Sequence, residues 1–296
     1  MSTFARVVEA GSFTAVAAAL GTPKSSVSRA VLRLEEALGV RLLQRTTRKL
    51  TLTEDGQTFL PRAQQILYQA REAAAEMAQR RGTLAGPLRV SGPVGFGILH
   101  LGPALNHFLS EHPDIDLTLE LDDAFVDAAA SGFDAVIRHG PVGDTRLVAK
   151  RLARTRRVLV ASPAYLAAKG RPAGLPDLSR HCGVLYANRD GDWRFAGAEG
   201  WTVVRPRAAL RVNNGLVMRD AALAGLGVTL LPTFFVHEQL ASGALVELDV
   251  GVEAEGAELF LAYPRDRGAS AKIAALTASL RRSFGDPPYW DVPAKL

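Results

Sequence analysis

Cysteine, long apolar runs and export signals are largely missing from this sequence. Its 296 residues include one cysteine, Cys182, which excludes an internal disulfide and is typical of a protein in the reducing cytoplasm. No stretch approaches the roughly 18 consecutive apolar residues that a membrane-spanning helix needs. The N-terminus lacks the basic segment, apolar run and cleavage site of a signal peptide. We therefore expect a cytoplasmic protein without a membrane partner, in which Cys182 is a small core residue rather than a redox sensor.

The signatures of common catalytic sites are absent as well. The sequence contains no GxSxG nucleophile elbow, no HExxH zinc motif and no cluster of cysteine and histidine. His100, His107 and His112 are five to seven residues apart, which does not bring them to one helix face at metal-ligand spacing. They are expected to be surface or packing residues. We predict no cofactor, no metal and no catalytic residue, and therefore no enzyme.

Positive charge is present in excess, and it is confined to one end of the chain. Residues 1–86 hold 12 Lys and Arg against 7 Asp and Glu, whereas residues 87–296 hold 23 of each. The whole net charge of +5 therefore lies in the first 86 residues. A basic region restricted to one small domain is what neutralisation of DNA phosphates requires, so double-stranded DNA is the expected partner.

Two short helices joined by a tight turn are predicted in this basic region. Ser12 can cap a helix from Phe13 to Leu20, and Gly21 suits the left-handed residue that ends it. Thr22 and Pro23 then provide a new N-cap and a first-turn proline. This spacing is typical of a helix-turn-helix, whose second helix enters the major groove. Opposite the apolar stripe of the second helix lie the candidate DNA-binding residues Lys24, Ser25, Ser28, Arg29 and Arg33.

A basic hairpin is predicted directly after the second helix. The segment from Arg41 to Thr53 places cationic side chains between apolar residues, and its last residues alternate leucine with threonine as a short strand does. An ordinary amphipathic helix with a solvated polar face is the alternative interpretation of the preceding helix. The basic hairpin beside it favours a winged helix-turn-helix that binds DNA.

The segments GSFTAVAAALG and SSVSRAVLRLEEALGVRLLQRTTRKLTLTEDG resemble the N-terminal domain of the LysR-type transcriptional regulators, almost without gap. The resemblance implies DNA contacts from Lys24, Ser25, Ser28 and Arg29 at the start of the recognition helix, and from Arg48 in the wing. Family members usually have glutamine where this sequence has Lys24. Because lysine favours guanine edges or phosphate where glutamine favours adenine, the base preference is expected to differ.

A long helix is predicted from Thr53 to about Arg81, with Pro61 in its first turns. Its apolar residues recur every three or four positions, which is the spacing of a coiled-coil seam. The predicted seam consists of Leu60, Ala63, Leu67, Ala70, Ala74 and Met77. Polar residues flank it, which favours pairing with a second copy over burial against the same chain. The protein is therefore expected to form a homodimer or homotetramer.

After the linker GTLAGP, predicted strands alternate with helices, one of them around Phe125 to Ala130. The alternation indicates two α/β halves with parallel sheets and helical crossovers. It resembles the effector domain of the same family, itself similar to periplasmic binding proteins. The motifs YLAAKGRPAGLPDLSRH, AALAGLGVTLLP and GALVEL resemble its malate-regulator and CrgA-like subgroup. A final helix, about Ala271 to Phe284, is expected to return to the first half.

The predicted fold class is thus α+β, with three parts along the chain. Residues 1–53 form the winged helix-turn-helix, 54–86 the dimerisation helix and hinge, and 87–296 a two-lobed α/β effector domain.

Candidate effector-binding residues lie at the carboxyl ends of predicted strands, where open α/β sheets bind ligands. The loop SGPVGFG lacks the lysine and glycine spacing of a phosphate loop, so it fits a tight turn as well as a ligand contact. Side chains alternate along a strand, so Arg138 and His139 are not expected to face the cleft together. The selected cleft residues are Pro93, Phe96, Arg138 and Asn214.

A small organic or aromatic acid is the expected effector, because Arg138 can bind a carboxylate through two hydrogen bonds and the family resemblance implies such inducers. We therefore predict a sequence-specific transcriptional regulator controlled by a small molecule between two lobes. The alternative is a two-lobed α/β enzyme or solute-binding module acting on a small organic acid. The missing catalytic motifs count against an enzyme, and the missing export signal counts against a free solute-binding protein.

Overall fold

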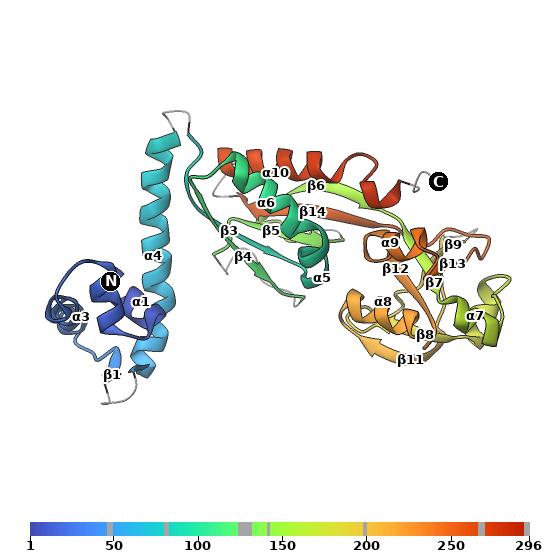
Figure 1. Cartoon of the computed structure of the whole chain (residues 1–296), viewed down its shortest axis with the longest axis horizontal. Helices are drawn as coiled ribbons and strands as arrows, with labels where there is room; N and C mark the ends of the chain where they lie inside the picture. Colours follow the sequence, from blue (N-terminus) through green and yellow to red (C-terminus); the bar gives the residue numbers. More distant parts are fainter. Residues whose placement is uncertain are drawn as a thin grey trace. The chain divides into compact units, whose positions relative to one another are not determined.

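The chain divides into two compact units, Met1–Pro87 and Leu88–Leu296 (Figure 1). The computed structural model describes residues 1–45, 50–79, 83–123, 132–140, 143–197, 200–265 and 270–292. Within these ranges, no helix combines the length and the apolar character that crossing a membrane requires. The predicted helix at 125–130 lies outside the described residues.

The first unit is built around one apolar core. Its elements in chain order are α1 (Ser2–Ala10), α2 (Phe13–Ala19), α3 (Lys24–Leu38), β1 (Leu43–Arg45), β2 (Leu50–Leu52) and α4 (Glu54–Gln79). The first three helices meet in the core, where Phe4, Val7 and Val31 are fully buried. Strands β1 and β2 pair antiparallel. The predicted arrangement of a winged helix-turn-helix followed by a long helix is confirmed.

Helix ends in this unit follow the predicted signals with one exception. The Ser12 hydroxyl accepts a hydrogen bond from the backbone N–H of Ala15 at 3.2 Å, and Gly21 is left-handed with φ of 60°. The predicted N-cap at Thr22 is wrong. Pro23 has an extended ψ of 143°, so it occupies the N-cap position itself and α3 begins at Lys24 without a side-chain cap.

A buried carboxylate joins α3 to the wing. Glu35 is 5% exposed, and its Oε1 accepts hydrogen bonds from the backbone N–H groups of Leu42 at 2.8 Å and Leu43 at 3.0 Å. The start of α4 lies against the same segment, since a Cβ on Gly56 would be 2.1 Å from the carbonyl oxygen of Leu42. Only glycine allows this approach. These contacts fix the first strand of the wing relative to the recognition helix.

The second unit contains a five-stranded sheet in each of two lobes. The order in the first lobe is β4 (Ile115–Leu121), β3 (Gly86–Gly92), β5 (Ala135–His139), β14 (Ala257–Pro264) and β6 (Leu147–Thr155). The order in the second lobe is β11 (Arg207–Val212), β8 (Cys182–Tyr186), β12 (Val228–Pro232), β7 (Arg157–Ala161) and β13 (Val246–Glu247).

Both sheets are mixed, which corrects the prediction of parallel sheets. Strand β3 pairs parallel with β5, and β8 pairs parallel with β11 and β12. In contrast, β14 is antiparallel to β5 and β6, and β12 is antiparallel to β7. The reason is the route of the chain. Strand β7 follows β6 almost directly, and β14 returns from the second lobe. Neither β7 nor β14 enters its sheet through a helical crossover, the connection that makes neighbouring strands parallel.

Helices pack on both sheets. In the first lobe α5 (Val94–Phe96), η1 (Gly97–Leu101) and α6 (Gly102–Glu111) follow one another without a break. Helix α10 (Ala271–Phe284) lies along α6 and packs on β6, which confirms the predicted return of the last helix (Figure 1). The second lobe carries α7 (Pro163–Lys169), η2 (Leu175–Arg180), α8 (Gly215–Leu223), η3 (Thr233–Phe235), α9 (His237–Ala241) and the hairpin of β9 (Arg194–Gly197) with β10 (Gly200–Val203). The turn η5 (Tyr289–Asp291) follows α10.

Candidate DNA interface and lobe junction

The predicted DNA-binding residues of the recognition helix lie on one side of α3. Lys24, Ser25, Arg29 and Arg33 are exposed and Ser28 is half-buried, while Val27 and Val31 anchor the opposite side in the core. Within the part of the chain that the structure describes, Lys24, Arg29 and Arg33 make no ion pair. Their charges are therefore not neutralised by neighbouring carboxylates. Arg48, the predicted wing contact, lies outside the described residues.

The predicted dimerisation seam on α4 has two parts. Leu60 packs against the core of the first unit and Ala63 is fully buried there, so neither is available to a partner helix. This corrects the first two positions of the seam, and the physical reason is that the start of α4 also covers the winged domain. Leu67 is half-buried, and Ala70, Ala74 and Met77 are exposed, Met77 by 51%.

Where the two lobes meet, one carboxylate bonds to both. Asp123, which follows β4, accepts a hydrogen bond on Oδ1 from the backbone N–H of Val94 at 2.9 Å. Its Oδ2 accepts another from the side-chain amide of Asn214 at 2.9 Å. Asn214 is also the N-cap of α8, because its Oδ1 accepts from the backbone N–H of Leu216 at 3.0 Å. Asp123 therefore ties the start of a helix in the first lobe to the start of a helix in the second.

Two of the predicted effector residues lie close to this carboxylate, in addition to Asn214. Pro93 precedes α5 in the N-cap position and is half-buried. Arg138 is half-buried at the end of β5; burial lowers the pKa of its guanidinium, and the carboxylates of Asp122 and Asp123 act in the opposite direction. Arginine remains cationic under these conditions. The structure thus places an arginine, two aspartates and an asparagine amide in one neighbourhood.

Phe96 was expected to line the same site, and that prediction is wrong. The helical run begins at Val94, directly after Pro93, so Phe96 lies in its first turn and points inward, with no exposed surface. It belongs to an aromatic cluster that consists of Phe96, His100, His139, Phe234, Phe284 and Trp290. His139 stacks on Phe234 with ring centroids 4.9 Å apart, while Arg138 lies toward Asp122 and Asp123. The predicted alternation of these two side chains is confirmed.

His100 is a neutral packing residue within the aromatic cluster. It is 3% exposed, its Nε2 donates to the carbonyl oxygen of Phe234 at 2.8 Å, and its Nδ1 accepts from the hydroxyl of Tyr289. Burial lowers the pKa of His100 to about 4. No group of three or more side chains suited to hold a metal ion occurs among the residues that the structure describes.

An aromatic side chain fills the junction beside Asp123. A Cβ on Gly95 in the first lobe would lie 2.5 Å from the ring of Phe235, and one on Gly215 in the second lobe would lie 2.3 Å from the same ring. Phe235 therefore occupies the space that these two glycines leave between the lobes. Neither Asp123 nor Phe235 was selected from the sequence, although the Asp122–Asp123 doublet directly after a predicted strand is a signal that could have been used.

Comparison with known proteins assigns both units. Residues 1–57 match the family described as bacterial regulatory helix-turn-helix protein, lysR family, and residues 81–285 match the LysR substrate binding domain. The chain belongs to the LysR family. It is a DNA-binding transcriptional regulator with an effector-binding substrate domain.

Relatives of this LysR-family regulator match over nearly the full length. The HTH-type transcriptional regulator YhjC of Escherichia coli (strain K12) is 36% identical over 92% of this chain and 93% of its own length. PtxR of Pseudomonas aeruginosa is 34% identical over 97% of this chain and 92% of its own length. The solved structure of CrgA from Neisseria meningitidis is similar with a TM-score of 0.58 and 31% identity, covering 96% of this chain and 95% of that one. The solved structure of full-length AphB of Vibrio cholerae is similar with a TM-score of 0.56 and 28% identity, covering 94% of this chain and 96% of that one.

Proposed function

We propose that this LysR-family regulator binds an interrupted inverted repeat of double-stranded DNA as a homodimer or homotetramer, and that a small carboxylate effector changes this binding by replacing Asp123 at the lobe junction. The observation that carries the proposal is the Asp123 carboxylate itself, held by the Val94 N–H and the Asn214 amide.

The DNA-binding part is supported by the exposed side of α3. Short hydroxyl side chains and cations at the start of a recognition helix reach phosphates and base edges in the major groove. Lys24, Ser25, Ser28 and Arg29 provide this combination, and Arg33 extends it along the helix. We assign base discrimination to Lys24, because it stands at the first residue of α3, and backbone contacts to Arg29, Arg33 and the wing residue Arg48.

The effector part is supported by the chemistry of the lobe junction. A carboxylate already uses the donors there, and the cationic Arg138 lies nearby. An effector carboxylate would find the same two donors and the guanidinium if Asp123 moved away. Such a ligand must also displace or repack Phe235, so a planar or aliphatic group of similar size suits the space between Gly95 and Gly215.

DNA binding is tested on a site selected from random duplexes with the full-length protein. Arg29→Ala should weaken binding at every sequence and lower the slope of affinity against salt by about one, whereas Lys24→Ala should change the ranking of sequences. Arg171→Ala, which removes an exposed charge from the second lobe, is the matched control. Unchanged affinity and unchanged ranking in both α3 variants would show that α3 is not the reading helix.

Effector binding is tested by thermal shift with succinate and benzoate as an aliphatic and an aromatic carboxylate. The two proteins compared, with and without Arg138→Ala, both carry Arg205→Gln/Arg211→Gln, which removes two exposed arginines of the second lobe. In this background we expect stabilisation by one of the two carboxylates, and loss of that stabilisation when Arg138→Ala is added, because the ligand loses its cationic partner. A carboxylate that stabilises both proteins equally would remove Arg138 from the effector site.

A further inference from the structure

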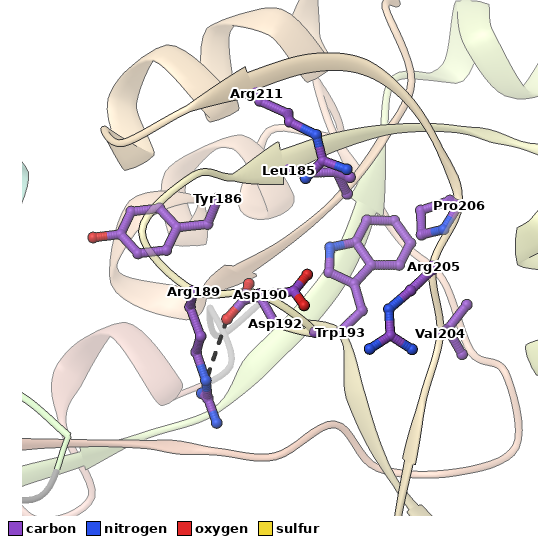
Figure 2. Close-up of a pocket in the computed structure, with 11 residues that line it drawn as sticks. Leu185, Tyr186, Arg189, Asp190, Asp192, Trp193, Val204, Arg205, Pro206 and Arg211 are labelled. Atoms are coloured by element: carbon purple, nitrogen blue, oxygen red, sulfur yellow. Dashed lines mark ion pairs between the residues drawn. The ribbon is translucent and has the colours of Figure 1, made fainter.

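A pocket in the second lobe does not involve the lobe-junction residues (Figure 2). It measures about 370 Å³, part of which is open solvent. The loop that follows β8 forms one wall, the segment leading into β11 forms another, and Arg211 of β11 borders it. Leu185, Val204 and Pro206 give this pocket an apolar surface around the ring of Trp193.

Trp193 carries a polar group that the protein does not satisfy. The residue is 2% exposed, and its indole Nε1 has no hydrogen-bond partner among the residues that the structure describes. Buried indole N–H groups usually find an acceptor, so this donor is available to an oxygen atom that the protein itself does not supply. Because neighbouring side chains cover the nitrogen, a ligand oxygen reaches it only after they shift slightly.

Three arginines, Arg189, Arg205 and Arg211, and two acids, Asp190 and Asp192, line the pocket. Asp192, the buried acid of the pocket, is already bonded to the buried guanidinium of Arg157, which also donates to the Asp192 carbonyl at 3.1 Å. Arg189 pairs with Glu255 at 2.6 Å. Arg205 and Arg211 make no ion pair within the described residues. Figure 2 shows these two guanidinium groups on opposite sides of the Trp193 ring.

Arg205 is exposed, and its guanidinium lies beside the loop at Gly191. A Cβ on Gly191 would lie 3.7 Å from its Nη2, and Gly191 is left-handed with φ of 61°. The loop thus favours glycine for its backbone conformation.

We propose that this pocket is a second effector site, which binds a small aromatic carboxylate. The planar arginine forks match a carboxylate, the apolar side chains of Leu185, Val204 and Pro206 match an aromatic ring, and the Trp193 N–H supplies a donor. The surplus of cations over unpaired acids disfavours an amine of the same size. This site is separate from the one proposed at the lobe junction, because the two share no residue.

Occupancy of the pocket has a short route to the lobe junction. Arg211 pairs with Leu185 in the parallel β11–β8 ladder, and Asn214, which bonds Asp123, is three residues further along the chain. A ligand that draws Arg211 toward the pocket therefore acts on the strand that leads into the N-cap of α8. Occupancy of the second site would therefore change the strength of the hydrogen bond between Asn214 and Asp123.

The test is isothermal titration of the full-length protein with benzoate, with benzylamine and inorganic phosphate as separate probes. We expect benzoate to bind, benzylamine not to bind, and the double variant Arg205→Gln/Arg211→Gln to weaken benzoate binding at least about tenfold. Arg171→Gln, an exposed arginine elsewhere in the second lobe, should leave the affinity unchanged. Trp193→Phe keeps the ring, removes the donor and should weaken binding by a smaller factor.

Several results would overturn the site. No benzoate binding at about 10 mM in the wild type would do so, since ligands of this size bind in the micromolar to millimolar range. Equal benzoate affinity in the wild type and the double arginine variant would do so as well. If Arg138→Ala alone abolished benzoate binding, the ligand would occupy only the lobe junction. Binding of phosphate in preference to benzoate would overturn the ligand class. Arg205 and Arg211 are exposed, so the double variant remains informative if Trp193→Phe does not fold.

Discussion

At the scale of single residues, buried and half-buried polar side chains set the geometry of the wing and of the lobe junction. Glu35 fixes the wing to α3 through two backbone N–H groups, and Asp123 joins the lobes through Val94 and Asn214. His100 uses both ring nitrogens inside the aromatic cluster. Removing such a partner leaves a buried donor or acceptor unsatisfied, at a cost of about 1–3 kcal/mol each. These residues are therefore sharp mutational probes, because near-isosteric variants change the hydrogen bonding while they keep the volume.

Glu35→Ala is expected to lower the free energy of unfolding of the first unit by about 2–5 kcal/mol, since two buried N–H groups lose their acceptor. Glu35→Gln keeps an acceptor oxygen and should lose much less. Glu36→Ala, an exposed neighbour on the same helix, is the matched control and should be nearly neutral. Urea unfolding of the three variants measures the difference. Equal losses for Glu35→Ala and Glu36→Ala would mean that the Glu35 bonds to Leu42 and Leu43 do not hold the wing.

His100 gives the second unit a predictable pH dependence. Its pKa falls from 6.5 in the unfolded chain to about 4 in the folded protein. Between these values the unfolded chain binds more protons, so the stabilisation is complete above about pH 6.5 and is lost as the pH falls toward 4. The difference corresponds to about 3 kcal/mol. Desolvation also lowers the pKa of His139 to about 4, so urea unfolding of the wild type at pH 7 and pH 4.5 should show the loss from both histidines.

The variant His100→Gln isolates that contribution. It should be less stable than the wild type at pH 7 but should lose less stability on acidification, because the titrating ring is gone. His107→Gln, an exposed histidine at the other end of the same helical run, should keep the pH response of the wild type. A wild-type response retained in His100→Gln would assign the acid sensitivity to other groups.

At the scale of elements, the sequence predicts helices better than strands. Cap signals and apolar periodicity locate α2 and α10 almost to the residue, because capping chemistry is local. Strand β6 was missed, since its LVAKRLART sequence alternates poorly and carries exposed cations at the edge of a sheet. The short β13 was missed because its partner, β7, lies far along the chain. The β9–β10 hairpin was missed because its strands are only a few residues long.

Helix α4 carries the element-scale prediction about assembly. Leu67→Glu places a charge between the exposed positions Ala70, Ala74 and Met77 and the buried start of the helix, and it should dissociate the homodimer. Gln65→Glu adds the same charge on the exposed side of the same turn and should leave the dimer intact. Sedimentation equilibrium at micromolar protein distinguishes the two outcomes. A dimer that persists in Leu67→Glu would place the interface outside this seam.

At the scale of the whole molecule, three of the four cleft residues selected from the sequence lie near the lobe junction, and Phe96 does not. Arg138 lies near the end of β5 and Asn214 follows β11, and strand ends converge in an α/β sheet, so their approach is predictable. The prediction for Phe96 is wrong because the helix starts earlier than the glycines and the proline of the SGPVGFG segment suggest. The early start directs the Phe96 side chain into the aromatic cluster. Asp123 and Phe235 meet only through long-range contacts between the lobes, and no local pattern encodes these contacts.

Asp123 also carries the prediction that separates regulation from folding. If an effector carboxylate must replace the Asp123 carboxylate, the neutral variant Asp123→Asn should bind the effector about tenfold more tightly, because the internal competitor is weaker and repels the ligand less. Asp122→Asn removes the same charge one residue away, without the bonds to Val94 and Asn214, and should have a smaller effect.

The measurement is titration with whichever carboxylate stabilises the wild type, in an Arg205→Gln/Arg211→Gln background so that the pocket in the second lobe does not contribute. An effector that binds the DNA-free and DNA-bound protein with different affinities must change the affinity for DNA by the ratio of those affinities. Fluorescence anisotropy of labelled DNA in the same samples should therefore show the effector acting at a correspondingly lower concentration in Asp123→Asn. Equal effector affinity in Asp123→Asn and Asp122→Asn would mean that Asp123 is only a structural tie between the lobes, and that the effector binds without displacing it.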